Sequence, residues 1–506
     1  MPGCVPEPDR DGTEGFARSG AELAGITEWL GGAQAAGLDH GELEEQIGVR
    51  AREVARLLLQ EHLDLRAERE RRRDDVAGPE GLARSRAERG HGRLLATTLG
   101  QVRVTRIAYR APGAPNVHPA DAALNLPPGK HSHGLCRLTV IEAARGSIGQ
   151  ACAAVERATG AGIGSRQAQQ IIRAAAADFG AFYARPERRP PPGGAPGAVL
   201  GLSCDAKGIV MRPGQLRPEA ARKAARSIPR QDGRLSRGEV RTRRRMAEVG
   251  AVFDITPAAR TAGDILPVPG RRAGPPPQAP RATGKWLTAS VADDAAAVVA
   301  EVFAEADRRD PARQRPWVAL VDGNTHQIRR IQAEAAARAV PVTVVCDVIH
   351  VIERLQDAAW CFFPEASPGA GPWVRDHARA VLHGQATAVA AAIREAITAA
   401  AGTLPAAKRK TAADTAAYLD AKAPWLDYPA ALAAGWPISS GVIEGACRYL
   451  VKDRMDITGA RWGLDTAEAI LKLRALLANG DFDAYWTYHL QRERERHYQA
   501  SNQPAA

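Results

Sequence analysis

Long apolar runs are missing from this sequence of 506 residues. Its alanine-rich stretches are interrupted by Arg, Asp and Glu, whereas a helix that spans a membrane needs about 20 consecutive apolar residues. The first residues, MPGCVPEPDRDGTEGF, also lack the basic start and apolar core of a signal peptide. We therefore expect a cytoplasmic protein without a membrane partner.

Paired cysteines are missing as well. The seven cysteines are scattered and form no CxxC pair, which argues against a disulfide framework and against a zinc ribbon. His131, His133 and Cys136 in HSHGLC could supply three metal ligands, but no fourth follows at a useful spacing. We expect reduced, mostly buried thiols.

Negative charge is outweighed by positive charge, with 57 acidic against 68 basic residues and a formal net charge of +11. This balance favours a polyanionic partner. From Arg212 to Glu248 the chain carries twelve Arg or Lys against four acids, without an apolar periodicity. Such a loop is expected to contact phosphate, although a solvated surface loop has the same composition. The predicted DNA contacts in it are Arg241, Arg243, Arg244 and Arg245.

Proline and glycine are abundant where the chain is expected to break. RPERRPPPGGAPG at 185–197 is typical of a linker between domains. Before it, residues 15–90 have helical patterns, including an amphipathic helix pair beginning at ELEEQ. RLLATTLGQVRVTRIAYRA then alternates like a β-hairpin, with Leu99-Gly100 as the turn.

Two helices follow the hairpin. The first ends at Gly160, a short turn runs to Gly164, and Ser165 is expected to cap the second. This layout predicts a helix-turn-helix that binds DNA, although a plain pair of antiparallel helices has the same pattern.

After the linker the pattern is that of an α/β fold, with a sheet covered by helices. From about 353 to 435 it is almost entirely helical. The expected strands lie at 198–211, 247–255, 285–293, 315–324 and 341–351, and the expected helices between them at 294–310 and 326–340.

Three carboxylates stand out in this second half. Asp205 interrupts an apolar strand, Asp322 ends another, and Glu444 lies on a late helix beside a stripe of Ile443 and Ala446. Side chains at strand ends gather at one edge of an α/β sheet. Converging carboxylates repel one another unless divalent cations compensate, and oxygen ligands suit Mg²⁺ or Mn²⁺.

Each acid also has an ordinary structural explanation. Asp322-Gly323 is a common turn pair, and Glu444 could be an acid at a helix start that is stabilised by the helix dipole. Arg448 and Lys452 follow Glu444 at four and eight residues; they could contact phosphates or simply pair with Glu444.

Four blocks resemble the signature segments of ISKra-type bacterial insertion-sequence transposases, members of the DDE superfamily. They are LSCDAKGIVMR, VALVDGNTHQI, VVCDVIHVIERL and WPISSGVIEGACRYLVKDRMDITGARWGL, and the resemblance covers roughly residues 90–490. It implies an RNase H-like catalytic domain with an α-helical insertion, preceded by a mainly helical DNA-binding region.

The resemblance also implies roles for single residues. Asp205, Asp322 and Glu444 correspond to the DDE triad that holds two Mg²⁺ or Mn²⁺ ions, and Asp347 and His350 to an accessory motif. Arg461 and Trp462 fall in a basic-aromatic segment that contacts DNA. Asp347 remains a rival to Asp322 as the second acid, and His350 could equally be an ordinary core histidine.

The resulting prediction is a DDE transposase that cleaves DNA with two metal ions and joins the ends of an insertion sequence to target DNA, as a homodimer or higher oligomer. The alternatives are a structure-specific nuclease without strand transfer, and a non-catalytic DNA-binding protein derived from a transposase. The predicted parts are an N-terminal helical region (1–90), a β-hairpin plus helix-turn-helix-like DNA-binding domain (91–184), the linker (185–197), the first part of the catalytic core (198–360), the α-helical insertion (361–435), the final helical part of the core (436–480) and a C-terminal tail (481–506).

Overall fold

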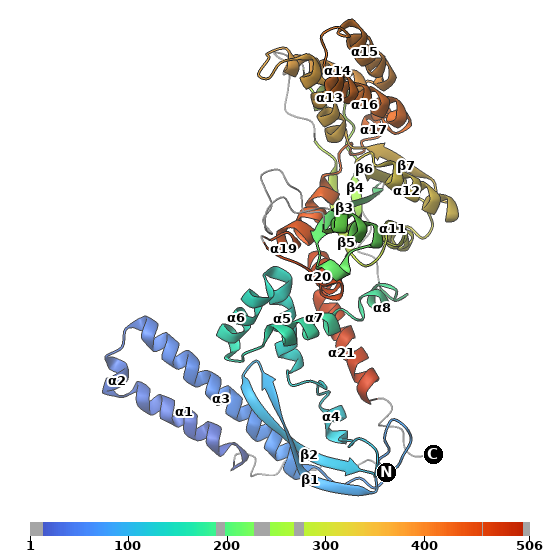
Figure 1. Cartoon of the computed structure of the whole chain (residues 1–506). Helices are drawn as coiled ribbons and strands as arrows, with labels where there is room; N and C mark the ends of the chain where they lie inside the picture. Colours follow the sequence, from blue (N-terminus) through green and yellow to red (C-terminus); the bar gives the residue numbers. More distant parts are fainter. Residues whose placement is uncertain (1–13, 189–197, 227–242, 268–277, 458, 499–506) are drawn as a thin grey trace. The chain divides into compact units, whose positions relative to one another are not determined.

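The computed structural model describes residues 14–188, 198–226, 243–267, 278–457 and 459–498 (Figure 1). The chain divides into two compact units, the first made of Met1–Ala184 with Asp481–Ala506 and the second of Arg185–Gly480. Most of the predicted linker at 185–197 lies outside the described residues, and so does Arg241. None of the described helices has both the length and the apolar character needed to cross a membrane.

The first unit combines a two-stranded sheet with helices. Its elements are η1 (Glu14–Phe16), α1 (Ala17–Leu30), α2 (Ala33–Ala36), α3 (His40–Arg69), β1 (Arg86–Thr97), β2 (Gly100–Arg110), α4 (Pro119–Ala123), α5 (His133–Arg145), α6 (Ile148–Thr159), α7 (Ser165–Ala175), α8 (Phe179–Tyr183) and α21 (Phe482–Tyr498).

The predicted hairpin is present, and its turn lies one residue earlier than expected. Thr97 pairs with Gly100, so Thr98 and Leu99 form the loop. The predicted helix pair is instead the single helix α3, which begins with a capping box between Asp39 and Glu42. Its Leu63 packs with Leu95, Val102 and Val104 of the hairpin, and this apolar core joins helix and sheet.

Helices α5, α6 and α7 share one apolar core. The core contains Leu135 of α5, Val155 of α6, Ala168 of α7 and Ile163 of the turn between α6 and α7. Helix α6 ends at Gly160, whose positive φ of 72° suits glycine. Helix α7 begins at Ser165 itself, so the residue before it, Gly164, is the cap, and the expected capping by Ser165 is wrong.

The last helix, α21, belongs to the first unit, and the predicted C-terminal tail therefore contains a structural helix. The hydroxyl of Tyr485 donates to the carbonyl of Ala175 at 2.6 Å. His489 and Arg496 both contact the carboxylate of Asp178 at 2.6 Å. These contacts attach α21 to the helices that precede the linker.

The second unit is an α/β domain with a mixed five-stranded sheet in the order β5-β4-β3-β6-β7. Strands β3, β4 and β5 are antiparallel neighbours, whereas β6 and β7 run parallel to β3. The strands are β3 (Val199–Val210), β4 (Arg244–Thr256), β5 (Arg281–Ser290), β6 (Trp317–Val321) and β7 (Val342–Cys346).

Strand β7 is shorter than the sequence predicts. It ends at Cys346, and Asp347 caps the next helix by accepting a hydrogen bond from the amide of Ile349 at 2.6 Å. The residues DVIHV, expected to continue the strand, therefore start helix α13 (Val348–Phe362).

Helices cover the sheet and extend beyond it. Helix α11 packs on β3 and β4, and α20 packs on β5. Helix α13 contacts α14 and α16, and α15 contacts α14 and α16, in the region predicted to be almost entirely helical (Figure 1). The remaining elements of this unit are η2 (Pro213–Gln215), α9 (Pro218–Arg226), α10 (Ala262–Ile265), α11 (Ala295–Arg309), α12 (Thr325–Ala337), α14 (Ala370–Leu382), α15 (Ala386–Ala399), α16 (Ala406–Lys422), η3 (Ala423–Trp425), α17 (Tyr428–Ala433), α18 (Gly441–Ala446), the π-helix η4 (Cys447–Lys452), α19 (Asp453–Met455) and α20 (Leu464–Asn479).

Candidate metal centre

Three aspartates occupy equivalent positions on the three parallel strands. Ser203 pairs with Leu320 on β3 and β6, and two residues further along each chain are Asp205 and Asp322. Val321 pairs with Cys346 on β6 and β7, and the next residues are Asp322 and Asp347. Neighbouring strands lie roughly 4.8 Å apart, so the register places Asp205 within β3 level with Asp322 and Asp347, which follow the ends of β6 and β7.

Asp347 is the most enclosed of these acids. It is fully buried, and its Oδ2 accepts hydrogen bonds from the amide and hydroxyl of Ser440, at 2.6 Å and 2.5 Å. The same serine hydroxyl lies 3.3 Å from Oε1 of Glu444. A hydroxyl has only one proton, so Ser440 can donate to one carboxylate at a time.

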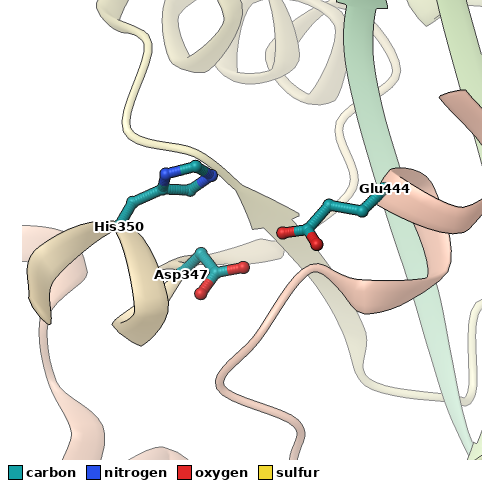
Figure 2. Close-up of side chains that lie close together, drawn as sticks. All are labelled: Asp347, His350 and Glu444. Carbon is teal, nitrogen blue, oxygen red and sulfur yellow. The ribbon is translucent and has the colours of Figure 1, made fainter. Parts of the chain in front are cut away.

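Asp347, His350 and Glu444 form a cluster that could hold a metal ion (Figure 2). One candidate ligand atom from each lies within 4.8 Å of the others. The carboxylate of Asp347, at the start of α13, and the carboxylate of Glu444, on α18, point toward one another (Figure 2). The imidazole of His350 lies beside the gap between these two carboxylates (Figure 2). It is the only such group of three among the described residues.

The electrostatics of this cluster favour a cation. Burial alone would lower the pKa of His350, but its hydrogen bond with Glu353 at 2.9 Å and the charges of Asp347 and Asp322 outweigh that effect and raise it. The negative field that stabilises a protonated imidazole would equally stabilise a bound metal ion. When Nδ1 donates to Glu353, the lone pair lies on Nε2, the usual arrangement of a metal-binding histidine.

Asp205 lies next to the helix that carries Glu444. Helix α18 packs on β3 and β4, and the thiol of Cys447 lies 3.4 Å from Oδ2 of Asp205. Burial and the adjacent Asp205 carboxylate raise the pKa of Cys447, so the thiol stays protonated and can donate. Cys447 therefore connects Asp205 to the turn of helix that follows Glu444.

Asp205 and Asp322 also line a cavity of about 500 Å³ that Glu444 does not reach. Helices α11 and α12 form its other wall, and Arg217, Arg330 and Glu248 contribute charge. Burial raises the pKa of Glu248, while the charge of Arg217 opposes that change. Sequence analysis missed Glu248, because a single acid on a strand gives no sign of facing a cavity.

The predicted triad thus divides between two neighbouring places. Glu444 lies with Asp347 and His350, whereas Asp205 and Asp322 share the cavity and fall outside the described 4.8 Å cluster. The contacts among the described residues favour Asp347 over Asp322 as the closest acidic neighbour of Glu444. No pattern in the sequence marks Ser440, which contacts both carboxylates of the cluster.

A π-helix begins three residues after Glu444, where α18 ends. Residues Cys447–Lys452 adopt it, and Arg474 donates to the carbonyl of Leu450 at 3.0 Å and to that of Tyr449. The wider turn changes the α-helical spacing that was expected to bring Arg448 beside Glu444. Arg448 instead lies 3.7 Å from Asp453, and both Arg448 and Lys452 are exposed.

The other predicted DNA contacts differ in exposure. Arg243, Arg244 and Arg461 are exposed. Arg245 is half-buried and donates to the carbonyls of Val291 and Ala292.

Trp462 is buried. Its ring nitrogen donates to the carbonyl of Met455 at 2.9 Å, and the guanidinium of Arg454 lies over its ring. The expectation that Trp462 contacts DNA is therefore not supported, because its ring is enclosed by the protein.

The helical insertion touches the loops that carry two of the acids. Lys422 of α16 is buried, and its ammonium donates to the hydroxyl of Thr325 at 2.6 Å, three residues after Asp322. The hydroxyl of Tyr428 donates to the carbonyl of Cys346 at 3.0 Å, immediately before Asp347. Gly323, with a positive φ of 89°, lies against Tyr418, and any side chain there would collide with the tyrosine hydroxyl.

Comparison of the sequence with models of protein families and with curated proteins found no match.

Proposed function

We propose that this protein is a DNA transposase that uses divalent metal ions, with an RNase H-like catalytic core in its second unit. The observation that carries the proposal is the strand register, which places Asp205, Asp322 and Asp347 at equivalent positions, with Glu444 of α18 beside Asp347. The mixed sheet, in which three antiparallel strands are followed by two parallel ones, supports the fold that the sequence resemblance implies.

The donor set fits a magnesium or manganese site. Carboxylate oxygens are the preferred ligands of both ions, and one imidazole is compatible with Mn²⁺ in particular. Two such ions, when bound, activate an attacking oxygen and stabilise a leaving oxygen during phosphodiester transfer. Asp347, His350 and Glu444 would hold one ion, and Asp205 and Asp322, which line the adjacent cavity, would hold the other.

The remaining residues bind and position DNA in this proposal. Arg448 and Lys452 are exposed on the π-helix that begins three residues after Glu444, where they can contact phosphates beside the scissile bond. Ser440 holds the Asp347 carboxylate in place through two hydrogen bonds. No covalent protein intermediate is needed, because a DNA 3′-hydroxyl released by hydrolysis is the nucleophile of the joining step.

Cleavage is tested with the full chain, a supercoiled plasmid and Mg²⁺ or Mn²⁺. Asp205→Asn should reduce metal-dependent nicking by roughly 10²–10³-fold, because a ligand of the reacting centre is lost. The matched control is Asp376→Asn, which changes an exposed carboxylate of α14 and should nick like the wild type. Undiminished nicking by Asp205→Asn would overturn the proposed centre.

Strand transfer is tested separately with duplexes taken from the DNA that flanks the gene, supplied with a free 3′-hydroxyl, and a target plasmid. A transposase yields joined products. Cleavage without any joined product would identify a nuclease, and the absence of both activities would identify a DNA-binding protein without catalysis.

A further inference from the structure

Helix α7 presents a polar face that the fold leaves open. Its buried side is formed by Ala168, Ile172 and Ala175. On the other side Arg166, Gln170 and Arg173 are exposed and Gln169 is half-buried. These positions are three, four and seven residues apart, so they form one stripe along the helix.

The only charges on this stripe are positive, those of Arg166 and Arg173. Helix α7 contains no Asp or Glu, and neither Arg166 nor Arg173 forms an ion pair with a described residue. Some other arginines of the same unit do have such partners: the half-buried Arg137 contacts Asp483, and the exposed Arg145 contacts Glu142. Two arginines without an acidic neighbour on one helix face complement a polyanion.

The side chains of the stripe are also those that distinguish bases. Arginine donates two hydrogen bonds to guanine, and glutamine pairs with adenine in the same bidentate way, in a major groove wide enough for one helix. Helices α6 and α7 share an apolar core with the turn that joins them, and Gly160 ends α6. In a helix-turn-helix, the second of two such helices enters the major groove. Gln167 and Gln170 are not part of the reading face, because both line a cavity with Trp486 and His489 of α21.

We infer that α7 is the helix that reads DNA sequence in this protein, with Arg166, Gln169 and Arg173 facing the base edges of a duplex. The inference rests on the proposed function for the identity of the DNA, which would be the ends of the mobile element. The preference for a DNA sequence is then a property of the first unit, whereas the acids proposed to bind metal belong to the second unit.

The experiment is a selection of bound duplexes from a pool with a randomised central segment, using the full chain in EDTA so that no cleavage occurs. The wild type should enrich one motif. Arg166→Ala and Arg173→Ala should each lose the preference at one or two positions and bind the selected motif about tenfold more weakly or worse, while binding random duplex almost as before.

Arg145→Ala is the matched control, since it removes an exposed arginine of the same helix cluster and should enrich the wild-type motif. Circular dichroism melting checks that each variant is folded. An unchanged motif in both α7 variants, no motif with the wild type, or stronger selection from an RNA pool would each overturn the inference.

Failure of the proposed function is recognised separately. Asp205→Asn should select the same motif as the wild type, because binding in EDTA does not involve the metal centre. A motif without metal-dependent cleavage would preserve α7 as the reading helix and remove the transposase activity.

Discussion

At the scale of single residues, the carboxylates of Asp347 and Glu444 share one serine hydroxyl. Neighbouring carboxylates repel one another, and a protein keeps them close only with protons, cations or hydrogen-bond donors nearby. Ser440 supplies two donors to Asp347, whereas Glu444 is exposed and has the longer contact of 3.3 Å. The arrangement is what a cation between the two acids would require.

His350 has two possible effects on such a cation, and they differ in sign. As a neutral ligand it would strengthen metal binding, whereas as a protonated partner of Glu353 it would repel the metal ion. We expect His350→Ala to weaken Mn²⁺ binding by about tenfold, the lower end of the effect known for groups that ligate or orient a metal. Calorimetric titration of the full chain with Mn²⁺ measures this.

His383→Ala is the control for that titration, because His383 is an exposed histidine of the same unit. Stronger Mn²⁺ binding by His350→Ala would show that the imidazole acts as a competing cation, and the assignment of His350 as a ligand would then be wrong.

At the scale of secondary-structure elements, the helical insertion supports the acidic loops. Lys422 and Tyr428, from α16 and α17, contact Thr325 and the carbonyl of Cys346, close to Asp322 and Asp347. A displacement of about 1 Å at a reacting centre can cost roughly 10²-fold in rate. We therefore assign the insertion a positioning role.

Lys422→Met tests that role. The change removes a buried ammonium and leaves the hydroxyl of Thr325 without its partner, so the Asp322 loop should shift and the nicking rate should fall roughly 10- to 100-fold. Rates are measured well below the melting temperature of the variant, so that loss of folded protein does not contribute.

Lys410→Met is the matched control on the same helix, because Lys410 is exposed and pairs only with Asp414. A rate unchanged in Lys422→Met would mean that the loop holds its conformation without α16. If Lys422→Arg restores much of the rate, the positive charge at this position is what the loop needs.

The strands of the second unit could be predicted because buried strands are apolar runs that end in polar residues. The alignment of Asp205 with Asp322 and Asp347 was not visible, since register depends on which strands are neighbours. The strand at Val342 was predicted too long, because Val348 and Ile349 are apolar in either conformation and only the cap at Asp347 ends the strand.

The π-helix could not be predicted either. Its sequence, CRYLVK, has an ordinary helical composition, and the contacts of Arg474 with the carbonyls of Tyr449 and Leu450 come from a helix further along the chain. The buried position of Trp462 depends likewise on strand-like hydrogen bonds with Val210 and Arg212, far away in sequence. Long-range contacts of this kind leave no local pattern.

At the scale of the whole molecule, the second unit is inserted in sequence between two segments of the first. Residues Met1–Ala184 and Asp481–Ala506 belong together, and Arg185–Gly480 lies between them. The first unit is therefore complete only after the second unit and the following helix α21 have been synthesised. Its integrity depends on how firmly α21 is attached.

The attachment of α21 depends on Asp178. Arg496 donates to both of its oxygens, at 2.6 Å and 2.9 Å, and His489 contacts it at 2.6 Å. Burial opposes ionisation of Asp178, but the hydrogen bonds to Arg496 and His489 outweigh it and lower its pKa below the ordinary value of 3.8. The folded state therefore prefers the charged carboxylate.

Asp178→Asn should loosen α21 at neutral pH by about 1–3 kcal/mol, the range for a hydrogen bond to a charged group. A carboxyl group with a lowered pKa in the folded state contributes its stability above its unfolded pKa, and that contribution disappears as pH falls through the folded pKa. The difference between wild type and variant should thus be full above about pH 4 and shrink below it. Hydrogen exchange of residues 482–498 measures the opening of α21 directly.

Arg492→Met, which removes an exposed partner of Glu495 on the same helix, should exchange like the wild type at every pH. Equal protection of α21 in Asp178→Asn and wild type at neutral pH would mean that Tyr485 and the apolar contacts hold the helix without the ion pair.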